Sequence, residues 1–213
     1  MPLHSRPTAD GALDPEIARA LARPEVARLA GRLRARVATS ATPLAESRLA
    51  AVAAVIRVPA DEPELLFIKR AIVERDPWSG HVAFPGGRIE PGDDTLEDTA
   101  IRETREELAL DLTAGCMLGR LDDLAPRTRA LPPIIVRPYV AVVRPGVEFT
   151  PSREVAATFW VPLRVLVHPE TQAEHVMTVN GVRARFPAYR VDEHLVWGLT
   201  ERIVRQLLSL FEP

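Results

Sequence analysis

RETREEL, residues 102–108, places three carboxylates, Glu103, Glu106 and Glu107, within five consecutive positions. No glycine or proline interrupts the surrounding segment 95–108, which is therefore predicted to be a helix. On a helix, residues three and four apart share a face, so Glu103 lies beside both other acids and each of these two like-charge pairs costs about 0.2–0.5 kcal/mol. A divalent cation bound between them would turn that repulsion into shared coordination, because hard Mg²⁺ prefers oxygen ligands.

Neighbouring residues bear on whether this acidic face holds a metal. The ordinary alternative is a solvated helix face, balanced by Arg102 and Arg105. Gly86 and Gly87, however, follow a predicted short strand one loop before the helix, so their carbonyls can reach the same metal and their amides can approach a phosphate. Arg102 also lies four residues before Glu106 and can fix that carboxylate's rotamer. Together these features favour a metal site.

Composition excludes several classes of protein. The chain has 213 residues, a net charge of -2 and a pI near 6.2, so nothing in its charge favours binding to nucleic acid or to a membrane. Cys116 is the single cysteine, so no internal disulfide can form. We find no signal-peptide core at the start and no apolar run of membrane-spanning length. A cytoplasmic, soluble protein is expected.

The hydrophobic pattern predicts a mixed α/β fold. A loop is predicted over 75–94, and an amphipathic helix closes the chain at 194–211. Strand-like apolar runs occur at 48–58, 64–71, 81–84, 117–126, 134–143 and 157–163.

The N-terminal part is predicted to be a helical extension over 1–47, followed by a main domain over 48–213. Residues 15–37 have helical spacing, with a break before Pro24 and with apolar side chains at Val26, Leu29, Leu33 and Val37. The arginines of this segment are expected to form a solvated helix face. One possibility is that residues 15–37 bind a partner or a second copy of the chain, which leaves a homodimer open.

The acidic segment resembles the Nudix hydrolase superfamily. Its box is matched by GRIEPGD, residues 87–93, and by RETREELAL, residues 102–110. Four departures are present: Asp93 stands for the first glutamate, one extra residue precedes Arg102, Thr104 takes the bulky apolar position and Ala109 takes the final glycine position. The resemblance implies an α/β/α sandwich with a mixed sheet, and hydrolysis of a pyrophosphate bond using Mg²⁺ or Mn²⁺.

A narrower resemblance is to the coenzyme A pyrophosphatase branch of this superfamily. It rests on LLFIKRA (65–71), Arg75, Gly80 and FPGGR (84–88), and on FPAYR and VWGLTERIVRQLL near the C-terminus. Four residues separate Arg75 from Gly80 where the branch has three. Coenzyme A or a derivative is the leading substrate. The alternative substrates are ADP-ribose, NADH or a nucleoside triphosphate. A further alternative is a module that senses a nucleotide without cleaving it.

The expected site combines metal ligands with substrate contacts. The metal ligands implied are Glu103, Glu106, Glu107 and Gly87, with Asp93 carried over only weakly. Arg102 and Glu154 complete the catalytic group, and Glu154 is the candidate base from outside the box. The candidate substrate contacts are Gly86, Gly87, Arg88, the phosphate clamps Arg70, Arg127, Arg129 and Arg137, and Trp78, which can stack on an adenine; Trp197 is expected to pack in the core with the last helix.

Overall fold

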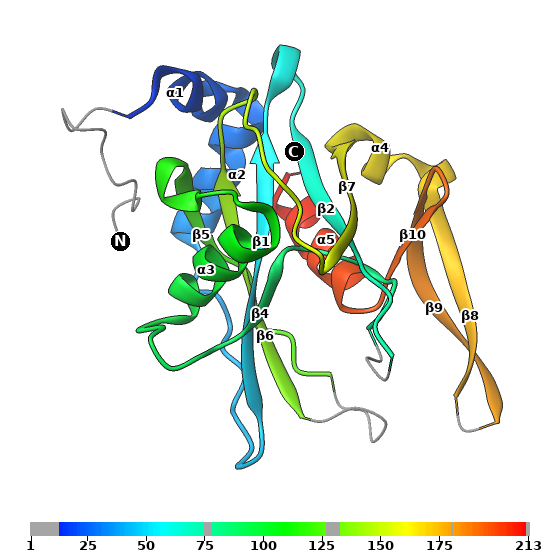
Figure 1. The fold of residues 1–213 in the computed structure, drawn as a ribbon. Coiled ribbons are helices and arrows are strands. Elements are labelled where there is room, and N and C mark those ends of the chain that lie inside the picture. Colours follow the sequence, from blue (N-terminus) through cyan, green and yellow to red (C-terminus); the bar gives the residue numbers. More distant parts are fainter. Residues whose placement is uncertain (1–12, 75–77, 127–132, 180, 212–213) are drawn as a thin grey trace.

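A seven-stranded mixed sheet forms the centre of the computed structural model, which describes residues 13–74, 78–126, 133–179 and 181–211 (Figure 1). The strand order is β3-β2-β1-β6-β5, with β4 also paired to β1 and β7 to β2. The pair β1·β6 is parallel and the other pairs are antiparallel. The strands are β1 (Arg48–Arg57), β2 (Glu64–Arg70), β3 (Val82–Ala83), β4 (Gly86–Arg88), β5 (Cys116–Arg120), β6 (Ile134–Val142) and β7 (Val155–Pro162).

One edge of β1 is shared by two strands. Ile56 and Arg57 pair with β2, whereas the segment 50–52 pairs with β4. The edge is divided because the chain leaves β2, forms the loop after Arg70 and returns at Gly86. This division brings the glycine pair to the middle of the sheet, beside the helix that follows.

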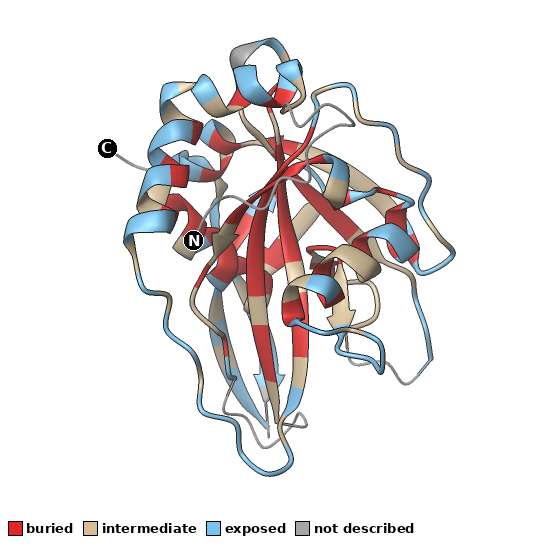
Figure 2. Cartoon of the chain, turned by 90° about the vertical axis from the view of Figure 1, so that its left-hand side faces the viewer, coloured by how far each residue is buried: buried red, intermediate tan, exposed pale blue. Residues whose placement is uncertain are grey.

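Helices cover both faces of the sheet, as expected for an α/β/α sandwich (Figure 2). Because side chains alternate along a strand, Ala54 and Ile56 of β1 enter one buried cluster while Ala53 and Val55 enter the other. The helix α3 (Leu96–Leu108) covers the second cluster. The first lies under α1 (Pro15–Ala22), α2 (Pro24–Ala35) and α5 (Leu199–Phe211).

The two N-terminal helices share a core with the main domain. Val26, Leu29 and Leu33 of α2 are buried, and α2 contacts α5 and β5. The apolar stripe considered for a partner is thus covered by this chain itself. Val37 was expected to join that stripe, but it is 96% exposed because α2 ends at Ala35.

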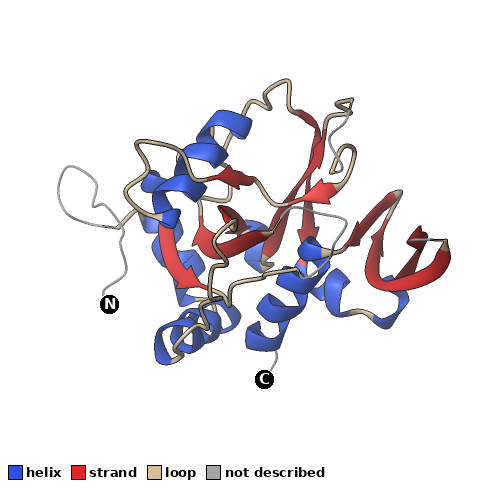
Figure 3. Cartoon of the chain, turned by 90° about the horizontal axis from the view of Figure 1, so that it is seen from below, coloured by secondary structure: helices blue, strands red, loops and turns tan. Residues whose placement is uncertain are grey.

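A second, three-stranded antiparallel sheet stands beside the first (Figure 3). It consists of β8 (Gln172–Val179), β9 (Val182–Val191) and β10 (His194–Trp197), and it follows the short helix α4 (Leu163–Val167). The helix predicted over 194–211 is therefore wrong in its first turn. Residues 194–197 pair with β9 instead, and Gly198, at φ +70°, ends β10 before α5 begins.

Short 3₁₀ turns at Pro59–Asp61, Leu112–Ala114 and Pro169–Thr171 connect the remaining elements. No helix in the described ranges is both long enough and apolar enough to cross a membrane.

Candidate active site

Both ends of α3 are defined by local interactions. At the start, the Thr95 hydroxyl accepts the N–H of Asp98 at 3.2 Å, and the Asp98 carboxylate accepts the N–H of Thr95 at 2.9 Å. This reciprocal capping box satisfies two backbone donors. At the end, Ala109 adopts the left-handed conformation, at φ +54°. The helix predicted from the sequence is confirmed, and it presents its acids toward β4 and the segment before β7.

Glu107 is the most buried acid of the helix. It is 4% exposed, and one carboxylate oxygen accepts the N–H of Gly86 at 2.9 Å. The other oxygen lies 3.7 Å from Nη1 of Arg70. Burial raises the pKa of Glu107 to about 7, with help from the charges of Glu103 and Glu154 and against the pull of Gly86 and Arg70.

Arg102 holds the other two box glutamates. Its Nη1 lies 3.1 Å from Oε1 of Glu103 and 3.1 Å from Oε2 of Glu106. Burial raises the pKa of Glu103, although Arg102 opposes that rise. A side chain at Gly87 would displace the Glu103 carboxylate. One at Gly86, at φ +151°, would overlap the backbone of Ala51 and Val52, so glycine is required there for β4 to pair with β1.

Asp93 faces Arg102 and is not among the residues that line the acidic cavity. Its two oxygens accept Nε and Nη2 of Arg102, both at 3.0 Å, and Thr99 and the N–H of Glu90 donate to the second oxygen. These bonds, above all the one from Arg102, hold the pKa of Asp93 well below its usual value. Arg102 Nη2 also donates to the carbonyl of Arg88 at 2.9 Å, which fixes the guanidinium from a third side.

A cavity of about 120 Å³ opens over this face, lined by Glu103, Glu106, Glu107, Ser152, Arg153 and Glu154. The last three residues are held against α3 because the N–H of Ser152 donates to the carbonyl of Glu107 at 2.7 Å. The carbonyl of Glu154 accepts the N–H of Ala71 at 2.8 Å, which joins this segment to the end of β2. Glu154, distant in sequence, therefore lies beside the box.

The donor set suits a hard divalent cation. Four carboxylates line one cavity, and burial is the main cause that raises the pKa of Glu103 and of Glu107, so a bound cation would favour their charged forms. In the part of the chain that the structure describes, no three acidic, histidine or cysteine side chains lie close enough to enclose an ion as they stand. In this arrangement Arg102 bonds two of the three box glutamates.

The other predicted contacts divide into three groups. Arg70 lies beside Glu107, and Trp78 lies half-buried in the loop that precedes β3. Arg137 is instead bound to Asp123, at 2.8 and 2.9 Å, so its proposed phosphate contact is not supported. Arg127 and Arg129 fall outside the described residues, as does Arg75.

Trp197 lies at the end of β10 and contacts His81, His175 and Phe186, so it does not pack as part of the last helix. The sequence interpretation overlooked Ser152 and Arg153, which line the cavity. Their position directly before Glu154 was the available signal.

Comparisons with known proteins agree with this geometry. A NUDIX domain profile matches residues 47–179. Two curated relatives are described as uncharacterized Nudix hydrolase NudL. The protein from Photorhabdus laumondii is 34% identical over 68% of this chain and 76% of its own length, and that from Yersinia enterocolitica is 34% identical over 68% and 73%.

Among solved structures, a MutT/nudix family protein from Enterococcus faecalis aligns over 92% of this chain and 73% of its own, with a TM-score of 0.55 and 15% identity, and so supports the fold. The family profile and the two relatives together establish the assignment. This chain belongs to the Nudix hydrolase family, whose members act on nucleoside diphosphate derivatives and generally use divalent metal ions.

Proposed function

We propose that this enzyme cleaves the pyrophosphate bond of a nucleoside diphosphate conjugate, with coenzyme A or a derivative as the leading substrate. The observation that carries the proposal is the cavity over α3, where Glu103, Glu106, Glu107 and Glu154 meet beside Arg70. The resemblance of segments 65–71 and 84–88 to the coenzyme A branch supports the substrate class. Cytoplasmic localisation is part of the same proposal.

In this proposal Glu103, Glu106, Glu107 and the Gly87 carbonyl hold Mg²⁺ or Mn²⁺. When bound, such an ion neutralises phosphate oxygens and lowers the pKa of an attacking water. Arg102 orients Glu103 and Glu106, because its Nη1 bonds both while Asp93 holds Nε and Nη2.

The remaining roles follow from position around the cavity. Glu154 is exposed at the cavity wall, where it can accept a proton from water. Arg70, 3.7 Å from Glu107, and Arg153, which lines the cavity, suit phosphate oxygens, which guanidinium groups bind in pairs. Backbone groups of Gly86 to Arg88 form the neighbouring wall, and Trp78 offers an aromatic face for a base. Arg127 and Arg129 remain candidate phosphate contacts.

A substrate panel tests this function. Coenzyme A, its acyl derivatives, ADP-ribose, NADH and nucleoside triphosphates are incubated with Mg²⁺ or Mn²⁺, and the products are separated by chromatography. One diphosphate conjugate is expected to give two monophosphate products. Glu107→Gln should slow that reaction on the order of 100-fold or more, and should weaken Mn²⁺ binding measured by calorimetry.

The matched control is Glu170→Gln, which changes a side chain that is 90% exposed and remote from the cavity. Its rate should equal that of the parent. Equal rates for Glu107→Gln and the parent would refute the role of Glu107. Binding without turnover across the panel would instead favour a nucleotide-sensing module, and turnover confined to ADP-ribose, NADH or a triphosphate would reassign the substrate.

A further inference from the structure

The second sheet ends in a long strand whose outer edge is open. Strand β8 pairs with β9 from Gln172 to Val179, and no other described strand pairs with it. Natural proteins generally protect edge strands with charged side chains, proline or bulges, whereas the eight residues of β8 contain no proline, lysine or bulge and have one acid, Glu174. The edge therefore offers a row of backbone donors and acceptors to another strand.

The outer half of the β8–β9 hairpin also exposes apolar side chains. Val176 is 38% exposed, Met177 is 36% exposed and Val182 is 67% exposed. The contacts of β8 with the rest of the chain are few; one of them is the ring contact of His175 with Trp197 at 4.1 Å. A two-stranded ribbon is marginal in water, and a third strand would bury part of this surface.

We infer that β8 pairs antiparallel with β8 of a second copy of this chain, forming a continuous six-stranded sheet across a two-fold axis near Val176. A two-fold axis makes the contact self-complementary, since each edge meets an identical edge. With Val176 on the axis, Glu174 stands opposite Thr178 of the partner subunit, and His175 stands opposite Met177 of the partner subunit. No like charges then face each other, whereas centring on Glu174 would oppose two carboxylates.

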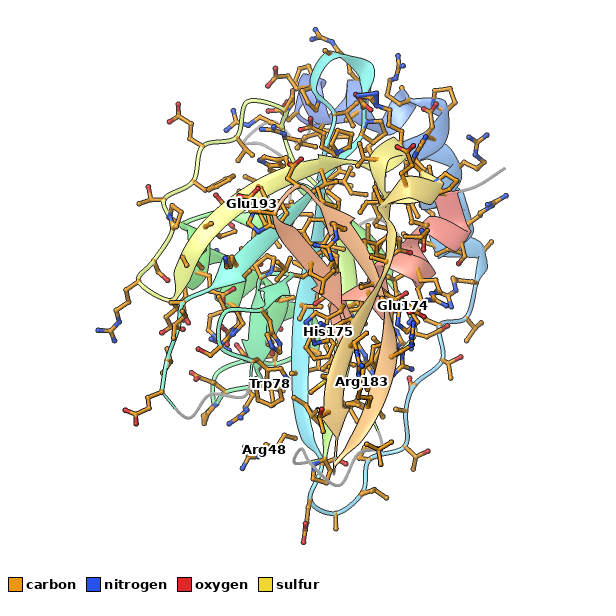
Figure 4. The ribbon with its side chains drawn as sticks, turned by 90° about the vertical axis from the view of Figure 1, so that its right-hand side faces the viewer. Arg48, Trp78, Glu174, His175, Arg183 and Glu193 are labelled. Carbon is orange, nitrogen blue, oxygen red and sulfur yellow. The ribbon has the colours of Figure 1, made fainter. Side chains whose placement is uncertain are left out.

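Charge complementarity supports this register and this partner. Within one chain Thr178 pairs with Arg183, so Arg183 lies on the same face as Glu174 (Figure 4). In the dimer, Glu174 and Arg183 of the partner subunit lie two strand spacings apart, about 10 Å between Cα atoms, a gap that the two long side chains can span over Thr178. Glu174 already pairs with Arg185, but both side chains are more than half exposed, so that ion pair contributes little to the hairpin.

The mass of the full chain in solution tests the inference. Light scattering and sedimentation are run across a range of protein concentrations, because an edge-to-edge contact is small. The expected mass at high concentration is twice the 23.5 kDa of one chain. Glu174→Arg and Arg183→Glu, each alone, bring like charges together in the dimer and should both give the mass of one chain.

A mixture of these two variants gives the decisive result. In the mixed pair the two substituted side chains face each other at one contact, with their charges exchanged, and the native pair forms the other contact. The dimer mass should therefore return. Arg28→Glu, which reverses an exposed charge on α2, should leave the parent's mass unchanged.

Two further measurements accompany the masses. Circular dichroism verifies that each variant is folded. Hydrogen exchange should show β8 amides protected in the parent and in the mixture but not in either variant alone. A single-chain mass for the parent at every concentration would overturn the inference. So would variants that remain dimeric, or a mixture that stays monomeric.

Discussion

Asp123 and Glu107 are two nearly buried acids with opposite electrostatic settings. Their side chains are 1% and 5% exposed. Asp123 accepts two bonds from Arg137, at 2.8 and 2.9 Å, and one from the N–H of Ala41 at 3.1 Å, with Arg120 at 3.4 Å. Glu107 accepts one backbone N–H and has its nearest cation 3.7 Å away.

The difference shows that pairing, and not burial alone, decides what a buried acid does. Burial by itself would raise the pKa of Asp123, but Arg137, Ala41 and Arg120 keep it below the usual value. The same effect of burial on Glu107 meets weaker opposition, so its pKa rises to about 7. A paired acid of the first kind stabilises the fold, and an under-compensated acid of the second kind is typical of a functional site.

Asp123→Asn is expected to have the largest effect on the free energy of unfolding. Removing the carboxylate leaves Arg137 without its charged partner in a largely buried setting, which should lower the free energy of unfolding by about 3–5 kcal/mol in urea titrations. Turnover per folded molecule should stay close to the parent's, because Asp123 does not line the cavity.

Asp111→Asn is the matched control for Asp123→Asn. It breaks the ion pair with Arg105, in which the two side chains are 48% and 55% exposed. The cost should stay within about 1 kcal/mol. If both variants lost the same small amount, Asp123 would contribute no more than a surface charge and the comparison would fail.

A smaller effect concerns the pH dependence of Glu107. Folding favours its protonated form, so its contribution to stability is full below about pH 4.5 and is lost as the pH rises through about 7. The pKa difference corresponds to at most about 3 kcal/mol. With metal removed by chelator, Glu107→Gln should therefore gain stability relative to the parent between about pH 5 and pH 8, as measured by urea unfolding at each pH.

The two acids, Glu107 and Asp123, should affect stability in opposite directions as the pH changes. Because the pKa of Asp123 is lowered, its contribution runs the other way and is lost as the pH falls. A stability difference between Glu107→Gln and its parent that does not vary with pH would show that Glu107 is not electrostatically strained.

The sequence was informative where local chemistry determines the structure. The spacing of Glu103, Glu106 and Glu107 predicts a helix face, and α3 confirms it. The pairing of Asp93 with Arg102 was not foreseen, because it depends on how the loop before Thr95 folds back over the helix.

Long-range pairing explains what was missed in the second sheet. Residues 194–197 have apolar spacing that fits a helix as well as a strand, and only their pairing with β9 selects the strand. The exposed outer half of β8 and β9 carries no buried face that the pattern could reveal.

The smallest expected effect lies at the end of α3, at Ala109. Its φ of +54° is the conformation that glycine adopts without cost, and the family's box has glycine at this position. Ala109 is exposed, so Ala109→Gly should lose no packing. Glycine relieves the strain of the left-handed conformation, which stabilises the folded chain, but its greater freedom in the unfolded chain opposes this gain. The net effect should raise the free energy of unfolding by about 0.5–1 kcal/mol.

The control for Ala109→Gly is Ala27→Gly, which should change the free energy of unfolding in the opposite direction. Ala27 is exposed inside α2, where glycine should cost about 1 kcal/mol. Both changes are measured as shifts in the urea midpoint at constant slope. If Ala109→Gly destabilised the chain as Ala27→Gly does, Ala109 would not hold the left-handed conformation in solution, and α3 would continue beyond Leu108. The helix that carries the carboxylates would then have no fixed end after Leu108. Ala109→Gly therefore tests how rigidly the acidic face of α3 is held.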